Sequence, residues 1–133
     1  MATNLSHEQF RQGGMLSIFL GRFDSEAELD QYLSATFPID FGFAIDPADG
    51  PEYHIDADRH CPVGKLLNGF SRSKEFSEVV AKGLVKRGWH RSRAAIVFNN
   101  FSYDPKVYPL YNHWGRMKFM GTFDLKTKTW TSF

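Results

Sequence analysis

The sequence predicts a single α+β domain with a mostly antiparallel or mixed sheet of about four to five strands, packed with two to three helices. Its 133 residues are the usual size of one domain. A hydrophobic content of 42%, with 13 phenylalanines, is typical of a packed core. Short apolar segments alternate with amphipathic ones, and no long linker divides them. We expect residues 1–14 to form a flexible N-terminal segment and residues 15–133 to form the domain.

The first strand and helix follow each other directly. Residues 15–20 are apolar on both faces, which is typical of an interior strand. Ser25 and Glu28 have the spacing of a capping box, so a helix should begin there. Phe37-Pro38 should end it, because a residue before proline is pushed out of the helical region.

Prolines and glycines break residues 38–62 into pieces, after which helical patterns return. Residues 53–58 alternate between apolar and polar side chains, which favours an edge strand or an extended loop. Residues 63–70 suggest a short helix, and a second should run from Ser73 to a stop at Gly88. We expect its buried face to contain Phe76, Val79, Val80 and Leu84. The two helices should share one side of the sheet.

The remaining strands are predicted near the C-terminus. Residues 94–98 form an uninterrupted apolar run, β-branched in its middle, which predicts a central strand. From Arg116 the side chains alternate, with residues 117, 119, 121 and 123 expected on one face. A polar turn at residues 124–128 should then lead into a last strand that contains Trp130.

Charge is distributed unevenly along the chain, although the net charge is only +1. Residues 1–64 contain three basic and eleven acidic residues, whereas residues 65–133 contain thirteen basic and four acidic ones. This polarity favours a binding surface rather than general solubility.

The acidic residues concentrate in the irregular segment 40–58, which has six carboxylates and no lysine or arginine. Such a surface can imitate nucleic-acid phosphates and dock on a basic protein cleft, with long-range attraction accelerating the encounter. The alternative interpretation is a solvated loop broken by prolines.

Two patterns in this region suggest chemistry but fit it poorly. His54, Asp56, Asp58 and His60 resemble metal ligands. Alternate residues of a strand lie roughly 6.5–7 Å apart, too far to converge on one ion. Cys61 beside His60 resembles a nucleophile and its base, but neighbouring strand residues point to opposite faces. We therefore expect no metal, no cofactor and no enzymatic activity. A small hydrolase would need a pocket that joins these histidines and aspartates.

The basic half supports a second interpretation. One group of cations surrounds the end of the helix predicted to begin at Ser73, where they favour its dipole: Lys82, Lys86, Arg87, Arg91 and Arg93. Another group lies near aromatic residues and could form a stacking groove for single strands: Arg72, Arg116 and Lys118 with Tyr108, Tyr111 and Trp114. The alternative function is thus a small nucleic-acid-binding regulatory protein, although no recognised signature accompanies these residues. The basic half could also neutralise the acidic half, within the fold or in a homodimer.

Hydropathy and cysteine content indicate the compartment. The longest apolar run has five residues, against about 20 for a spanning helix, so we expect no membrane contact. Residues 1–14 lack the apolar core of a secretory signal. A lone cysteine forms no intrachain disulfide. We predict a cytoplasmic protein.

Four stretches of the sequence share the order and residue types of one bacterial family. The first is LSIFLGRF at residues 16–23, followed by SEAELDQYL at residues 25–33. The last is AAIVF at residues 94–98, continuing to Tyr103-Asp104-Pro105. Between them, Asp40-Phe41-Gly42 and residues 66–76 also fit. Over most of residues 15–105 the chain thus resembles the immunity protein 22 family.

The resemblance implies a small cytoplasmic antidote that binds a cognate polymorphic toxin, often a nuclease, and blocks it stoichiometrically. We expect residues 40–58 to occlude a basic cleft of that toxin. The expected contacts are Asp40, Asp46, Asp49, Glu52, Tyr53, Asp56 and Asp58, with Phe43 as a further aromatic anchor. The family's acidic step after Asp-Phe-Gly is replaced here by residues 44–47, so its contact residues do not transfer there. The aromatic loop at residues 108–114 lies outside the resemblance.

Overall fold

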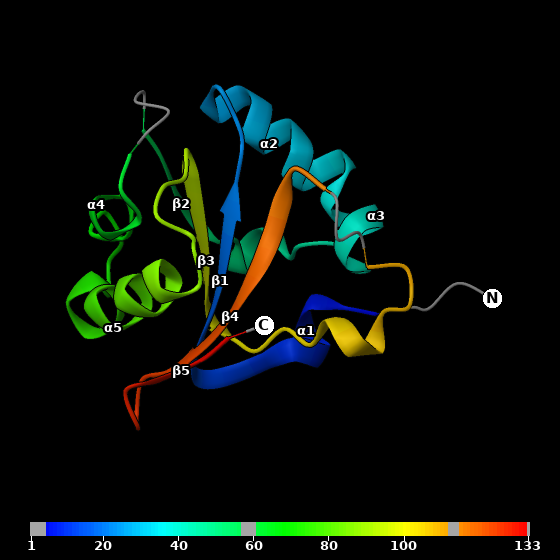
Figure 1. Ribbon diagram of the computed structural model, residues 1–133. Helices are drawn as coiled ribbons and strands as arrows, with labels where there is room; N and C mark the ends of the chain where they lie inside the picture. Colours follow the sequence, from blue (N-terminus) through cyan, green and yellow to red (C-terminus); the bar gives the residue numbers. More distant parts are fainter. Residues whose placement is uncertain (1–4, 57–60, 112–114, 133) are drawn as a thin grey trace.

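An antiparallel sheet forms the centre of the fold (Figure 1). The computed structural model describes residues 5–56, 61–111 and 115–132. Within them the sheet has five strands in the order β2-β3-β1-β4-β5. The strands are β1 (Arg11–Gly21), β2 (Glu52–Ile55), β3 (Ala94–Phe101), β4 (Met117–Asp124) and β5 (Thr129–Ser132). This confirms the predicted α+β class.

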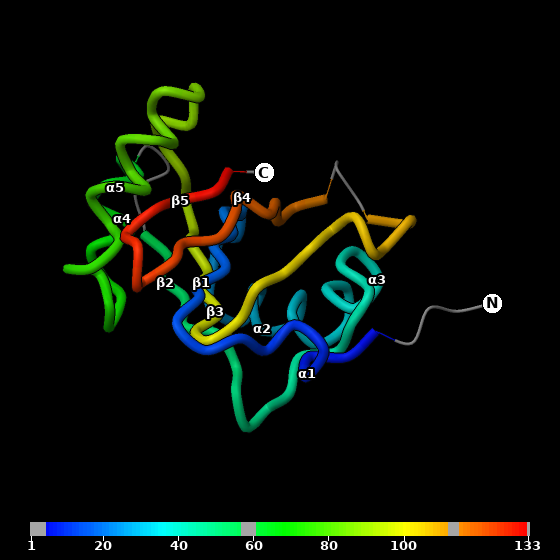
Figure 2. The backbone as a smooth tube through the Cα atoms, turned by 90° about the horizontal axis from the view of Figure 1, so that it is seen from below, coloured from blue at the N-terminus to red at the C-terminus, as the bar shows by residue number. Residues whose placement is uncertain are grey.

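Helices cover both faces of the sheet. The α-helices in the described residues are α1 (His7–Phe10), α2 (Glu26–Ala35), α3 (Phe37–Phe41), α4 (Val63–Leu67) and α5 (Ser73–Lys86). Two short 3-10 helices, η1 (Pro47–Asp49) and η2 (Pro105–Val107), lie in the connections. Figure 2 shows α4 and α5 on one side of the sheet and α1, α2 and α3 on the other. The prediction that the two helices after residue 62 share a face is therefore confirmed. None of the described helices is long and apolar enough to cross a bilayer.

The inner strands are buried on both faces because their apolar side chains alternate between two cores. In β3, Ile96 and Phe98 contact the aromatic core beneath α2 and α3, whereas Ala95 and Val97 contact the core beneath α4 and α5. In β1, Phe19 belongs to the first core, and its neighbours on both sides belong to the second. Uninterrupted apolar runs are what such doubly covered strands require.

The chain enters regular structure earlier than the sequence predicts. Residues 7–10 form α1, and β1 begins at Arg11 rather than at Met15. His7 and Phe10 are buried, so this part of the expected flexible segment packs on the aromatic core. Helix α3 is not predicted by the sequence, because a proline at residue 38 indicates the end of a helix. In the structure Pro38 lies in the first turn of α3, where its missing N–H removes no helical hydrogen bond.

A bulge changes the faces of β4. Ile18 of β1 pairs with Gly121, whereas Phe19 pairs with Phe119, so Met120 is an extra residue in the ladder. Phe119 therefore faces the aromatic core and Phe123 the opposite one, and the predicted single face for both is wrong. Gly121 has φ +128°, and a Cβ there would lie 2.2 Å from the carbonyl oxygen of Thr131.

Helix α5 packs closely against the last strand. A Cβ on Gly83 would lie 2.3 Å from Cζ3 of Trp130, so the absence of a side chain lets the indole ring approach the helix. Phe76, Val80 and Leu84 are buried as predicted, whereas Val79 is 42% exposed. Val79 lies on the solvent-exposed face of α5, away from β5, so the prediction that its side chain is buried is wrong.

Candidate functional site

Asp40 lies in the core rather than on the expected acidic surface. The residue is only 6% exposed, and its carboxylate accepts a 2.5 Å hydrogen bond from the buried hydroxyl of Tyr32. Burial, together with this bond to Asp40, raises the pKa of Tyr32 far above its usual value, so the phenol remains the proton donor. Phe43 is also buried. Neither Asp40 nor Phe43 is available to a partner in this conformation.

Asp46 and Asp49 lie at the surface around a single guanidinium. Arg11 donates to Asp49 at 3.0 Å and contacts Asp46 at 3.4 Å, and it also pairs with Glu8. The side chains of Glu8, Asp46 and Asp49 are 73%, 43% and 39% exposed. We call Glu8, Arg11, Asp46 and Asp49 the Arg11 cluster. Three carboxylates and one guanidinium leave it with two negative charges.

His7 lies beneath this cluster and adds no positive charge at neutral pH. Its Nδ1 accepts a 3.1 Å hydrogen bond from the backbone N–H of Asp46, which requires that nitrogen to be unprotonated. Burial lowers the pKa of His7, and the attraction of Asp49 only partly opposes this. The ring packs against Phe43 and Phe101. The Arg11 cluster therefore remains anionic above a neutral histidine.

Glu52 and Tyr53 form part of the edge strand β2 and both have partners within the fold. The carboxylate of Glu52 accepts hydrogen bonds from the Ser71 hydroxyl at 2.6 Å and from Asn99 at 2.8 Å. Burial alone would raise the pKa of Glu52, but these hydrogen bonds outweigh it and lower the pKa. The Tyr53 hydroxyl donates to Asp30 at 3.0 Å. Both side chains are half-buried.

The predicted metal pattern is only partly described. Asp56 lies 3.9 Å from the ammonium of Lys65. Asp58 and His60 lie outside the described residues. Among the residues that are described, no group of three or more histidine, cysteine or acidic side chains could hold a metal ion. Cys61 is buried in the core beneath α4 and α5.

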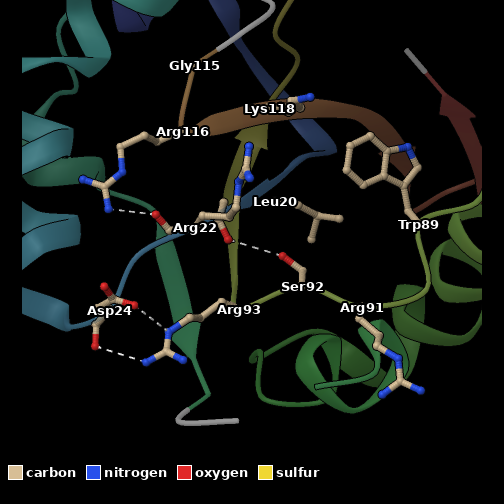
Figure 3. Close-up of a pocket in the computed structure, with 11 residues that line it drawn as sticks. Leu20, Arg22, Asp24, Trp89, Arg91, Ser92, Arg93, Gly115, Arg116 and Lys118 are labelled. Atoms are coloured by element: carbon tan, nitrogen blue, oxygen red, sulfur yellow. Dashed lines mark hydrogen bonds and ion pairs between the residues drawn. The ribbon is translucent and has the colours of Figure 1, made fainter. Parts of the chain in front are cut away.

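A basic pocket lies at the opposite end of β1 from the Arg11 cluster, where β1 ends and β3 and β4 begin (Figure 3). Its cavity volume is about 760 Å³. Five cationic side chains and one carboxylate line it beside an indole ring: Arg22, Arg91, Arg93, Arg116, Lys118, Asp24 and Trp89. We call this the basic pocket.

Sequence reasoning missed this pocket because its residues come from three separated segments. The sequence predicts that Arg91 and Arg93 lie at the end of a helix and that Arg116 and Lys118 lie in an aromatic stacking groove. A usable signal is that these cations flank the ends of three apolar strands. An antiparallel sheet can bring such strand ends together at one end of the sheet. Trp114 of the predicted stacking groove lies outside the described residues. The Tyr111 ring packs on Phe41.

Comparison with known proteins supplies no relative: no family model, no curated protein and no solved structure matches this chain. The resemblance to the immunity protein 22 family therefore stays a prediction.

Proposed function

We propose that this protein is an immunity protein that binds and neutralises a cognate polymorphic toxin domain by stoichiometric occlusion. The observation that carries the proposal is the Arg11 cluster, where three carboxylates surround one guanidinium above a neutral histidine. Its residual negative charge is at the surface, where it can steer a basic partner. A nuclease active site, which must bind phosphates, is such a partner.

One further carboxylate, Asp30, lies at the same edge of the sheet as the chain that follows Asp49. Asp49 ends the 3-10 helix immediately before β2, and β2 is an edge of the sheet. Asp30 of α2 lies beside that edge, because Tyr53 donates to it. Lys126 and Lys128 lie in the turn before β5, at the opposite edge. Asp30 and Asp49 thus lie toward the β2 edge of the sheet, and Lys126 and Lys128 lie toward the β5 edge.

The proposed contact surface is narrower than the sequence predicts. It centres on Glu8, Asp46 and Asp49, and it includes Tyr53, a half-buried aromatic residue of β2. Asp40 and Phe43 stabilise the core instead. Partner recognition would then combine exposed charge with one aromatic contact.

A charge-removal experiment tests the proposal. Asp46→Asn with Asp49→Asn removes two charges while retaining the side-chain oxygens that accept hydrogen bonds. Glu75→Gln with Glu78→Gln on α5 is the matched control, since it removes equal charge elsewhere. The resemblance implies that a cognate toxin domain is encoded beside this gene. Association of that domain with the protein is to be measured by stopped flow at about 50 mM salt.

We expect the Asp46/Asp49 variant to associate about tenfold more slowly and the control to be unchanged. Added salt should reduce the difference between the variant and the parent protein, because it screens steering. Equal rates for parent and variant at low salt would contradict the assigned surface. Failure of the intact protein to bind the toxin domain, or to protect a host expressing it, would contradict the function.

A further inference from the structure

The basic pocket contains two kinds of cation, and the first kind is already neutralised. Arg93 donates to the carbonyl oxygen of Phe23 at 2.9 Å and lies 3.4 Å from the Asp24 carboxylate. Arg116 donates to the Arg22 carbonyl oxygen at 2.9 Å and pairs with Glu28. These contacts fix the two guanidinium groups as one wall of the pocket.

The second kind is Arg22 and Lys118. Within residues 5–56, 61–111 and 115–132, neither has a carboxylate within ion-pair distance. Lys118 pairs with Leu20 across the β1–β4 ladder, and Arg22 lies two residues beyond Leu20. The two cations therefore occupy diagonal positions on one face of the ladder, within reach of a common ligand. Arg91 also lines the pocket, but its side chain points away from this group in Figure 3.

Trp89 gives the pocket an aromatic side. The ring is half-buried, and the ammonium of Lys118 lies 5.4 Å from its centre. An indole beside two cations suits a ligand that combines a flat ring with an anionic group. A volume of about 760 Å³ lies within the range of small-ligand sites, roughly 300–1,000 Å³.

We propose that the basic pocket binds the phosphate group of a nucleotide, with Arg22 and Lys118 holding the phosphate and Trp89 contacting the base. A guanidinium forms paired hydrogen bonds to phosphate oxygens, and an ammonium adds a compact charge. Arg93 and Arg116, already paired with Asp24 and Glu28, complete the wall of the pocket without adding net charge. The inference is independent of the proposed immunity function, because the basic pocket and the Arg11 cluster lie at opposite ends of β1.

Titration calorimetry with adenosine 5′-monophosphate, adenosine, inorganic phosphate and a thymidine pentanucleotide tests this proposal at about 20 mM salt. The test variant is Arg22→Gln with Lys118→Met, and Lys82→Met with Lys86→Gln on α5 is the control of equal charge. Arg22→Lys tests geometry at constant charge. Thermal unfolding of each variant establishes that it folds.

We expect saturable binding of the monophosphate and weaker binding of adenosine. The test variant should lose about tenfold or more in affinity, and the control should bind like the parent protein. The affinity of the Arg22→Lys variant should lie between those of the test variant and the control. Tighter binding of the pentanucleotide than of the monophosphate would identify a single strand as the source of the phosphate. Absence of binding by all phosphate probes at millimolar concentration, or equal loss in test and control variants, would overturn the inference.

Discussion

At the scale of single residues, Asp40 shows how an acidic side chain can belong to the core. Its carboxylate is buried and accepts a short hydrogen bond from Tyr32. A buried charge that loses a donor is left poorly solvated, which costs more than the bond contributed. The pair therefore joins α2 to α3, although the sequence alone places Asp40 among surface carboxylates.

Tyr32→Phe should lower the free energy of unfolding by about 1.5–3 kcal/mol, because it removes that donor from a buried carboxylate. Tyr108→Phe is the control, since the Tyr108 hydroxyl donates to the carbonyl oxygen of Ile39 at an exposed position. There the loss should be less than about 1 kcal/mol. Urea unfolding measures both, and equal losses would show that burial of Asp40 does not decide the cost.

His7 should make stability depend on pH. Its pKa is lowered in the fold, so between that pKa and 6.5 the unfolded chain binds more protons than the folded one. The contribution of His7 is therefore present above about pH 6.5 and is lost as the pH falls toward the folded pKa.

The free energy of unfolding should decline between pH 7.5 and 5.5, and His7→Asn should flatten that decline. Asparagine can retain an acceptor for the backbone N–H of Asp46 but does not titrate in this range. His90→Asn is the matched control at an exposed position. Urea unfolding at several pH values gives the comparison, and an unchanged slope in His7→Asn would refute the assignment.

At the scale of elements, the sequence predicts what its local patterns determine. The N-cap at Ser25 is present, because its hydroxyl accepts from the Glu28 N–H one turn into the same helix. The predicted return bond is displaced by one residue, since the Glu28 carboxylate accepts from the N–H of Asp24 rather than of Ser25. The strand at residues 94–98 follows from an apolar run. The bulge at Met120 could not be predicted, because it depends on which residues of β1 lie opposite.

The candidate sites likewise combine features that the local sequence predicts with features that depend on residues far apart in the chain. The exposed positions of Asp46 and Asp49 agree with their proline-rich segment. Their shared partner Arg11 is more than 30 residues away, so the sequence gives no sign of it. The basic pocket likewise depends on the meeting of three strand ends.

Two glycines in neighbouring helices should respond oppositely to the same substitution. Gly83→Ala should destabilise the protein by about 1–3 kcal/mol, because its Cβ would overlap the Trp130 ring. Gly64→Ala should stabilise it by about 0.5–1 kcal/mol, since its nearest neighbour is the Cβ of Ala81 at 3.8 Å. Thermal unfolding of the two variants measures both effects. Stabilisation by both substitutions would show that the Trp130 ring can move away from α5 at little cost.

At the scale of the molecule, the protection of backbone amides against hydrogen exchange should decrease from the middle of the sheet outward. Strand β1 pairs on both sides, with β3 and β4, whereas β2 and β5 are edges of only four residues each. Hydrogen exchange should be slowest in residues 16–20 and 95–98, where the backbone is also buried between two cores. Equal protection in β5 would contradict this order.

The central position of β1 also determines when the protein can fold during its synthesis. Leu16 pairs with Asn99 and with Phe123, so both neighbours of β1 leave the ribosome long after β1 itself. At about 5–20 residues per second, the last partner emerges roughly 5–20 seconds later. Until β4 emerges, β1 can pair with β3 but lacks its neighbour on the other side. The topology therefore builds a delay of this length into folding during synthesis.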